Sequence, residues 1–342
     1  MVRTMVLLRA LIRTARMARH TSSLAAGLPA DDEVLLDAPD ARLGPALVAA
    51  GRGEYRPAAR LLAATREDAA WEDRDRYVMR LAAFAGARPE WLARWRTDAP
   101  RDPDLLLLVA ERAVADAWSS PARAERLHEV TDLVTAAARP APGDPVPWRV
   151  ALDHARGTPV PRVPFEELWA EAVRRSPHHY GCHVAALRFL ATAGGGAGHG
   201  QCFDFAERAA QDALPDSLVQ ALPVRAVFGH LSSPAGPDPV PRARLDAAAD
   251  RGVALSARYA PADPWPAEVR NLLVCVLVRL ERWTDALEQV RRIGPYATSF
   301  PWDRLSDDPL GQFLEVRDGV RIEVAASTPL RTRPRRAPAD DH

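Results

Sequence analysis

The chain is 342 residues long and 47% of them are apolar, which is enough to bury a core and excludes wholesale disorder. Lysine and arginine together number 45, as do aspartate and glutamate, so the net charge gives no argument for a nucleic-acid partner. No apolar run reaches the roughly 18 residues that a membrane-spanning helix needs. The odd number of cysteines (Cys182, Cys202 and Cys275) is typical of reduced thiols, and we expect a cytoplasmic protein.

Residues 1–40 are predicted to form a basic amphipathic helix and a loop. The first 20 residues contain arginines but no acid, and a helix would place Leu7 and Leu11 opposite Arg9. Such a helix either lies on an anionic membrane, which would make the protein a membrane-peripheral adaptor, or packs on a neighbouring helix. We favour packing on a neighbour.

Apolar residues recur at helical spacing along the chain, and proline or glycine separates the runs. The predicted helices cover residues 43–50, 54–65, 70–85, 89–96, 103–118, 122–138, 148–155, 267–282 and 284–293, and another begins at Phe165 and ends at a turn marked by Pro177. Further helices are expected after Pro177, after the glycine-rich residues 194–200 and after Pro215. The leucine run at residues 105–108 predicts a helix that is buried nearly all round. Strands and helices do not alternate before about residue 310, which excludes a dinucleotide-binding or P-loop fold and predicts an all-α protein.

The C-terminal residues leave two alternatives open. Residues 314–324 alternate apolar and polar side chains around Asp318 and Gly319, which favours a tight β-hairpin. The valines of the same stretch also recur at helical spacing, as in a capping helix. We therefore predict a terminal hairpin or a capping helix for residues 311–328. Residues 329–342 form a polar tail that we expect to be disordered.

Two patterns recur at the predicted helix boundaries. Prolines spaced by 42, 35 and 38 residues mark the points where one helix closes and the next opens: Pro100, Pro142, Pro177 and Pro215. Inside the hairpins an aromatic residue stands three positions before an alanine, in Tyr55-x-x-Ala58, Phe203-x-x-Ala206 and Trp283-x-x-Ala286. The ring would wedge between paired helices, and the alanine would let their backbones approach closely.

These patterns resemble the tetratricopeptide repeat, whose unit is about 34 residues long. The likeness covers about residues 40–300, and it extends to tetratricopeptide-like proteins of high-GC bacteria. It implies a fold of stacked antiparallel helical hairpins that form a right-handed superhelix, and it implies no activity. We accordingly assign residues 41–310 to one helical-repeat domain.

The group formed by His178, His179, Cys182 and His183 is the strongest candidate for chemistry. On a helix, His178 would pair with Cys182 and His179 with His183, at the i, i+4 spacing that lets two side chains share a metal. A metal site needs further ligands, and Cys202 would lie at the opposite end of the hairpin, roughly 16 Å away at about 1.5 Å per helical residue. We expect no metal and no cofactor there. A small-molecule or metal-binding enzyme centred on this group is the alternative hypothesis.

No other arrangement is typical of catalysis. Residues 194–200 follow a helix and lack the Gly-Lys-Ser/Thr ending of a phosphate loop, so we interpret them as a turn. The sequence has no Gly-x-Ser-x-Gly nucleophile elbow. Cys275 lies in an apolar run, which predicts a buried and inert thiol. We therefore expect no catalytic residues and a protein that is not an enzyme.

The predicted function is a non-enzymatic scaffold or adaptor that binds a protein or peptide partner in a superhelical groove. The first helices of successive hairpins would line this groove. The candidate lining residues are Glu111, Trp118, His183, Arg188 and Asn271. Aromatic side chains on such a surface act as anchors. We expect neither a nucleic acid nor a membrane surface as the partner.

Overall fold

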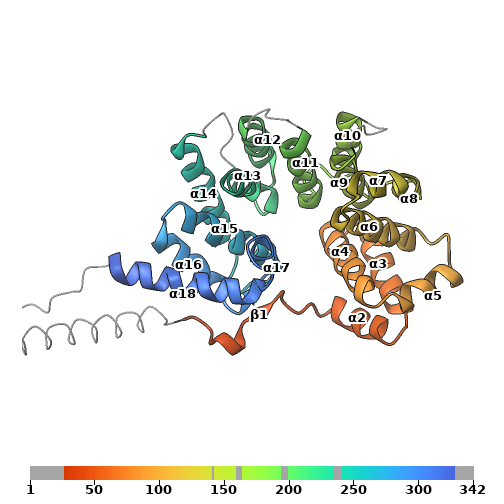
Figure 1. Cartoon of the computed structure of the whole chain (residues 1–342), viewed down its shortest axis with the longest axis horizontal. Helices are drawn as coiled ribbons and strands as arrows, with labels where there is room; N and C mark the ends of the chain where they lie inside the picture. The colour runs from red at the N-terminus through yellow and green to blue at the C-terminus, as the bar shows by residue number, and fades with distance from the viewer. Residues whose placement is uncertain (1–26, 141, 159–163, 194–198, 234–239, 328–342) are drawn as a thin grey trace, which may run out of the picture. The chain divides into compact units, whose positions relative to one another are not determined.

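The computed structural model describes residues 27–140, 142–158, 164–193, 199–233 and 240–327, and helices dominate it (Figure 1). Contacts divide the chain into two compact units. The central unit is Pro39–Arg258, and the described part of the terminal unit consists of residues 27–38 and 259–327. The predicted basic helix at residues 1–20, the tail at 329–342 and most of the glycine-rich turn lie outside the described residues.

The central unit is built from helices, as the all-α prediction requires. They are α2 (Leu43–Gly51), α3 (Arg56–Glu67), α4 (Trp71–Ala87), α5 (Glu90–Asp98), α6 (Pro103–Ser119), α7 (Arg123–Glu129), α8 (Thr131–Ala138), α9 (Val146–Arg156), α10 (Phe165–Arg175), α11 (Tyr180–Ala193), α12 (His199–Asp212), the 3₁₀ helix η2 (Leu218–Ala221), α13 (Leu222–Ser232) and α14 (Arg242–Ala257). The prediction of one helix over residues 122–138 is wrong, because Val130 leaves the helical conformation between α7 and α8. The hydroxyl of Thr131 donates there to the carbonyl oxygen of His128, a local bond that competes with the helical ladder.

The terminal unit joins residues from both ends of the described chain. Its elements are η1 (Asp31–Glu33), β1 (Leu35–Leu36), α15 (Ala267–Arg279), α16 (Trp283–Ile293), β2 (Tyr296–Ala297), α17 (Ser299–Trp302) and α18 (Pro309–Ser327). The short strands β1 and β2 pair in parallel, with Leu35 opposite Tyr296. This pair was not predicted, and the predicted domain boundary at residue 310 falls inside the terminal unit.

Helix α18 decides between the alternatives for residues 311–328 in favour of the helix. It buries Phe313, Val320 and Val324 on one side, as the helical spacing of the valines allows. A lone hairpin has too few partners to be stable in water. None of the helices in the described ranges is long and apolar enough to cross a membrane.

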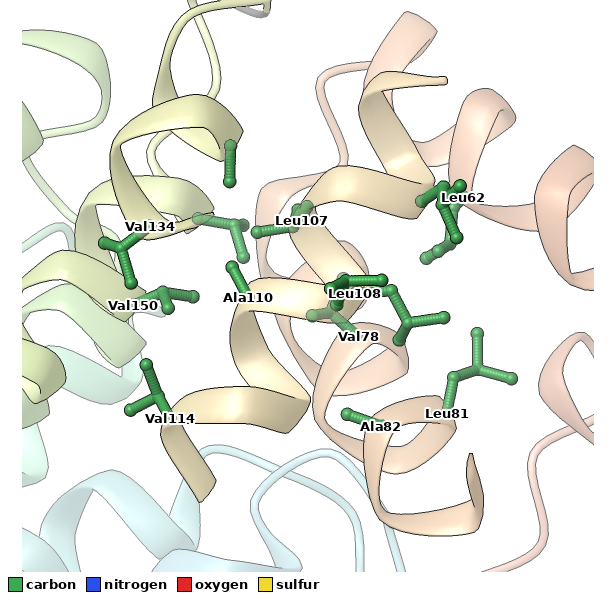
Figure 2. Close-up of a cluster of buried hydrophobic side chains, with 14 of the residues drawn as sticks. Leu62, Val78, Leu81, Ala82, Leu107, Leu108, Ala110, Val114, Val134 and Val150 are labelled. Carbon is green, nitrogen blue, oxygen red and sulfur yellow. The ribbon is translucent and has the colours of Figure 1, made fainter. Parts of the chain in front are cut away.

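Helix α6 lies at the centre of the core of the central unit, where it packs against α4 and α8. Leu105, Leu107 and Leu108 are at most 1% exposed, while Leu106 is half-buried and Ala115 and Asp116 are exposed. The prediction of burial nearly all round therefore holds for most of the leucine run and not for the C-terminal half of the helix. Figure 2 shows Leu108 turned toward Val78 of α4, and Leu107 turned toward Val134 of α8. Burial of each such leucine stabilises the fold by roughly 2 kcal/mol.

The alanines of the aromatic-x-x-Ala patterns are all fully buried, as predicted: Ala58, Ala206 and Ala286. A methyl group at these positions lets neighbouring helices pack closely. Tyr55 stacks on Trp95, with ring centroids 5.5 Å apart, and so links the start of α3 to α5. The packing is compatible with a helical-repeat fold.

Candidate functional site

Helix α4 presents two adjacent charged residues, Arg74 and Asp75, to the interior of the central unit. Both are buried, and they point roughly 100° apart because a helical turn holds 3.6 residues. They therefore belong to two separate clusters of charge. Neither residue was predicted from the sequence to belong to a site. The available signal was that Arg74 precedes Val78 by four residues and Leu81 by seven, which puts a charge on the apolar face of the helix.

Arg74 joins α4 to three other segments. Its Nη2 donates to Oδ1 of Asp104 and its Nε donates to Oδ2 of Asp144, both at 2.6 Å, while Nη1 donates to the carbonyl oxygen of Leu62 at 2.7 Å. Bonds between charged groups of this kind are about twice as strong as neutral ones. Burial raises the pKa of Asp144 although Arg74 opposes the shift. We call Arg66, Arg74, Asp104 and Asp144 the Arg74 cluster.

Arg66 extends the Arg74 cluster to the surface. Its Nε and Nη2 donate to the two oxygens of Asp104 at 3.2 and 3.3 Å, which is the bidentate geometry that guanidinium and carboxylate favour. The hydrogen bond with Asp104 raises the pKa of Arg66, so the guanidinium stays charged. Because Arg74 fixes Asp104 in turn, the partly exposed Arg66 has a defined orientation.

A hollow of about 560 Å³ opens beside Arg66, between α3 and the turn that joins α5 to α6. We call it the Arg66 hollow. It is lined by Ala59, Arg60, Ala63, Arg66, Ala99, Pro100, Arg101, Asp102, Pro103 and Asp104. The space exists because half of these side chains are alanine or proline, which are too short to fill it. Its volume lies in the range of ligand sites, roughly 300–1,000 Å³.

Two further arginines stand at the Arg66 hollow. Arg60 projects from α3 and Arg101 from the α5–α6 turn, and both are exposed. Neither makes a hydrogen bond or ion pair within the described part of the chain. Three guanidinium groups over a floor of small side chains are suited to binding a group that accepts hydrogen bonds.

Arg149 of α9 is the centre of the second cluster. Its Nε and Nη2 donate to Oδ1 of Asp75 at 2.8 and 2.6 Å, and its Nη1 donates to Oε2 of Glu111 at 2.5 Å. Oδ2 of Asp153 lies 3.7 Å from the same Nη1. We call Asp75, Glu111, Arg149 and Asp153 the Arg149 cluster. Burial raises the pKa of Glu111 although Arg149 opposes the shift.

The edge of the Arg149 cluster is incompletely paired. Oδ1 of Asp153 is buried and has no hydrogen-bond partner among the described residues. The nearest cationic groups are Nε of Arg156 at 3.8 Å and Nη1 of Arg188 at 3.9 Å, which is too far for hydrogen bonds. On the other edge, Gly181 lets α11 approach Asp75, since a methyl group at that position would collide with the Asp75 carboxylate.

The structure brings three of the five predicted groove residues to the Arg149 cluster. Glu111 belongs to the cluster, Arg188 lies at its edge, and Nε1 of Trp118 donates to the carbonyl oxygen of Asp153 at 3.0 Å. The guanidinium of Arg156 also lies 3.7 Å from the centre of the Trp118 ring. Glu111 and Trp118 are thus occupied by partners within the protein.

The other two predicted groove residues lie elsewhere. His183 is buried on α11, where its Nδ1 donates to the carbonyl oxygen of His179 at 2.9 Å. Burial lowers the pKa of His183 to about 4, so the ring is neutral. Asn271 lies in the terminal unit, where it is fully buried, donates to the carbonyl oxygens of Ala267 and Tyr296, and accepts from Nε1 of Trp302. Its bonds hold that unit together, and it forms no surface.

The side chains of the histidine and cysteine group bond differently from the i, i+4 pairs predicted for a helix. His178 lies before α11, which begins at Tyr180, and the ring of His183 donates to the carbonyl oxygen of His179. Nδ1 of His179 instead lies 3.1 Å from Sγ of Cys182. The Cys182 amide donates to this Nδ1 at 3.2 Å, and the Cys182 thiol donates to the carbonyl oxygen of Pro145 at 3.6 Å. Burial raises the pKa of Cys182, so the thiol stays protonated. Both side chains are 1% exposed, which leaves a substrate no access.

His179 also connects this group to the Arg149 cluster. Its Nε2 lies 3.9 Å from Oδ2 of Asp75 and 4.0 Å from Oε2 of Glu72. Within the described ranges, no three His, Cys, Asp or Glu side chains converge as a metal site would require.

Comparisons of the chain with protein-family models, with curated proteins and with solved structures found no match.

Proposed function

We propose that the protein is a non-enzymatic scaffold or adaptor that binds a protein or peptide partner, and that the Arg66 hollow is its binding site. The observation that carries the proposal is the pair of exposed arginines, Arg60 and Arg101, which have no partner in the described part of the chain and flank a hollow of about 560 Å³. Exposed arginine is enriched among the residues that dominate protein interfaces.

The Arg74 cluster supports binding because it makes the wall of the hollow rigid. Arg66 is held by Asp104, which is held by Arg74, and both of these side chains are almost fully buried. A donor that is already ordered loses little conformational entropy when a partner arrives. Arg66 is therefore preorganised for recognition, and Arg60 and Arg101 become ordered when the partner binds.

The proposal moves the binding site away from the groove expected from the sequence. Glu111 and Arg188 lie at the Arg149 cluster, where Arg149 and Asp153 are their nearest charged neighbours. The hollow, by contrast, has arginines available for a partner. We retain the tetratricopeptide-like superhelix as the proposed arrangement of the hairpins, and a cytoplasmic location in view of the buried free thiols of Cys182, Cys202 and Cys275.

A peptide-display selection on the immobilised full-length protein tests this function. Ala63→Phe would fill the hollow from its floor, and Ala83→Phe places the same side chain on an exposed position of α4 outside the hollow. We expect the wild type and Ala83→Phe to enrich the same peptide family and Ala63→Phe to enrich none. Circular dichroism of both variants confirms that they fold. Absence of enrichment, or enrichment that Ala63→Phe does not change, would contradict the proposal.

A further inference from the structure

The carboxylates of the Arg66 hollow are already engaged inside the protein. Asp102 caps α6, since its Oδ1 accepts the amide of Asp104 at 2.9 Å, and its Oδ2 accepts Nε1 of Trp95 at 3.2 Å. Asp104 accepts from Arg74 through Oδ1 and from Arg66 through both oxygens. Neither acid therefore has an oxygen left without a donor.

The hydrogen-bond donors of the hollow, by contrast, are largely available. All nitrogens of Arg60 and Arg101 lack partners among the described residues. Arg66 uses Nε and Nη2 for Asp104, which leaves its Nη1 available. The hollow thus has donors that are available and acceptors that are already bonded, which favours a ligand rich in hydrogen-bond acceptors.

The net charge of the hollow further limits the kind of ligand that fits it. Three arginines and two aspartates line the hollow, so its net charge is +1, which matches a single carboxylate. A phosphate group carries about −1.5 to −2 at neutral pH and would exceed that charge. The floor of Ala59 and Ala63 is apolar and accommodates the aliphatic part of an acidic side chain.

We propose that the Arg66 hollow recognises an acidic segment of a protein partner, whose aspartate or glutamate carboxylate accepts hydrogen bonds from Arg60, Arg66 and Arg101. This inference rests on the proposed function and specifies the chemistry of the partner. Bidentate pairing of guanidinium with carboxylate gives both strength and orientation. Arg66 is the fixed member of the set, while Arg60 and Arg101 close on the carboxylate from the two sides of the hollow.

A cellulose-bound array of random heptapeptides tests the inference, with the central position fixed as Asp, Glu, Asn, Gln, Lys or phosphoserine. Labelled full-length protein is applied as the wild type, as Arg60→Gln/Arg101→Gln and as the charge-matched control Arg88→Gln/Arg139→Gln, whose arginines are exposed and lie outside the hollow. We expect the Asp and Glu pools to retain at least about tenfold more wild type than the Asn and Gln pools, as charge-assisted bonds predict. The Arg60→Gln/Arg101→Gln variant should lose this preference, and the control should keep it.

Three results would overturn the inference: equal retention by the Asn and Gln pools, strongest retention by the phosphoserine pool, or an equal loss in the charge-matched control. The proposed function fails separately. If the wild type binds the peptide pools regardless of the charge at the central position, and Ala63→Phe abolishes this binding, the hollow is a peptide site but its ligand is not acidic. Retention of no pool would reject both.

Discussion

Arg74 and Arg149 each connect carboxylates from other segments of the central unit, yet the two clusters differ in how completely their oxygens are paired. In the Arg74 cluster, every oxygen of Asp104 and Asp144 accepts at least one hydrogen bond. In the Arg149 cluster one guanidinium meets three carboxylates, and Oδ1 of Asp153 accepts none within the described residues.

The difference shows that a buried ion pair can serve two purposes. A complete network fixes its members, and the Arg74 cluster uses that rigidity to hold Arg66 at the hollow. Burial raises the pKa of a carboxyl in each cluster, Asp144 and Glu111. Glu111 also has two further carboxylates beside it, Asp153 and Asp75, which favour uptake of a proton and raise its pKa further. The first cluster should therefore respond strongly to loss of a member, and the second should respond more to pH.

Removal of Arg74 should have the largest effect. Arg74→Met leaves Asp104 and Asp144 buried without their main cation, and breaking a buried pair in this way costs about 3–5 kcal/mol of folding free energy. Urea denaturation followed by circular dichroism measures the loss.

Arg88→Met provides the control for that experiment, because Arg88 is exposed at the C-terminal end of the same helix and the substitution should change stability by no more than about 0.5 kcal/mol. A loss below about 1 kcal/mol in Arg74→Met would show that the two aspartates do not depend on Arg74. The contrast between the clusters would then disappear.

Acid should also act outside both clusters, at His183 of α11, which has a pKa of about 4 because burial disfavours its charged form. Unfolded histidine titrates near 6.5, so only the unfolded chain gains a proton between pH 6.5 and 4. The stabilisation from His183 is full above pH 6.5, and about 3 kcal/mol of it is lost as pH falls to 4. In His183→Phe, which places a ring beside Trp169 and Phe205, this part of the acid sensitivity should vanish.

The measurement is the free energy of unfolding of both proteins across that pH range. His128→Gln, at an exposed histidine, should keep the acid sensitivity of the wild type. Parallel curves for the wild type and His183→Phe would rule out His183 as its source.

Local patterns in the sequence predicted the helices well and the clusters poorly. A helix was predicted from Phe165 to the turn at Pro177 and forms α10, and most of the leucine run at residues 105–108 is buried in α6. Such elements are determined by spacing within a few residues. Arg74, in contrast, bonds to Asp104 and Asp144, which are 30 and 70 residues away, and no local pattern specifies such a partner.

The dependence on contacts between distant segments also explains why the candidate site residues were only partly predicted. Glu111, Trp118 and Arg188 were chosen as residues of one inner surface, and they do gather near Asp153. The contacts of these residues with Arg149 and Asp153 depend on how α6, α9 and α11 pack, which the sequence does not specify. The Arg66 hollow was missed because its lining comes from α3 and from the α5–α6 turn, two segments distant in the sequence that meet only after folding.

Asp104→Asn should have an intermediate effect on the complete cluster. The amide keeps one acceptor but turns a second group of donors toward Arg66 and Arg74, so we expect a loss of about 2 kcal/mol in folding free energy. Asp116→Asn is the matched control, because Asp116 forms an exposed pair with Arg112 on the same helix and such pairs contribute at most about 1 kcal/mol. Equal losses in the two variants would contradict the special role of Asp104.

The smallest effect is expected for Glu111→Gln in the incomplete cluster. Glutamine keeps an acceptor for Nη1 of Arg149 and removes one of three carboxylates, so stability at pH 7 should stay within about 1 kcal/mol of the wild type. The pKa of Glu111 is raised in the folded state, so its protonated form is favoured there and the wild type loses stability as pH rises through that pKa. The free energy of unfolding of the variant should therefore increase relative to that of the wild type as the pH rises above the ordinary pKa of glutamate, as measured by urea titrations at a series of pH values. A cost at pH 7 as large as that of Asp104→Asn would show that both clusters need every carboxylate, and the distinction between a complete and an incomplete network would fail.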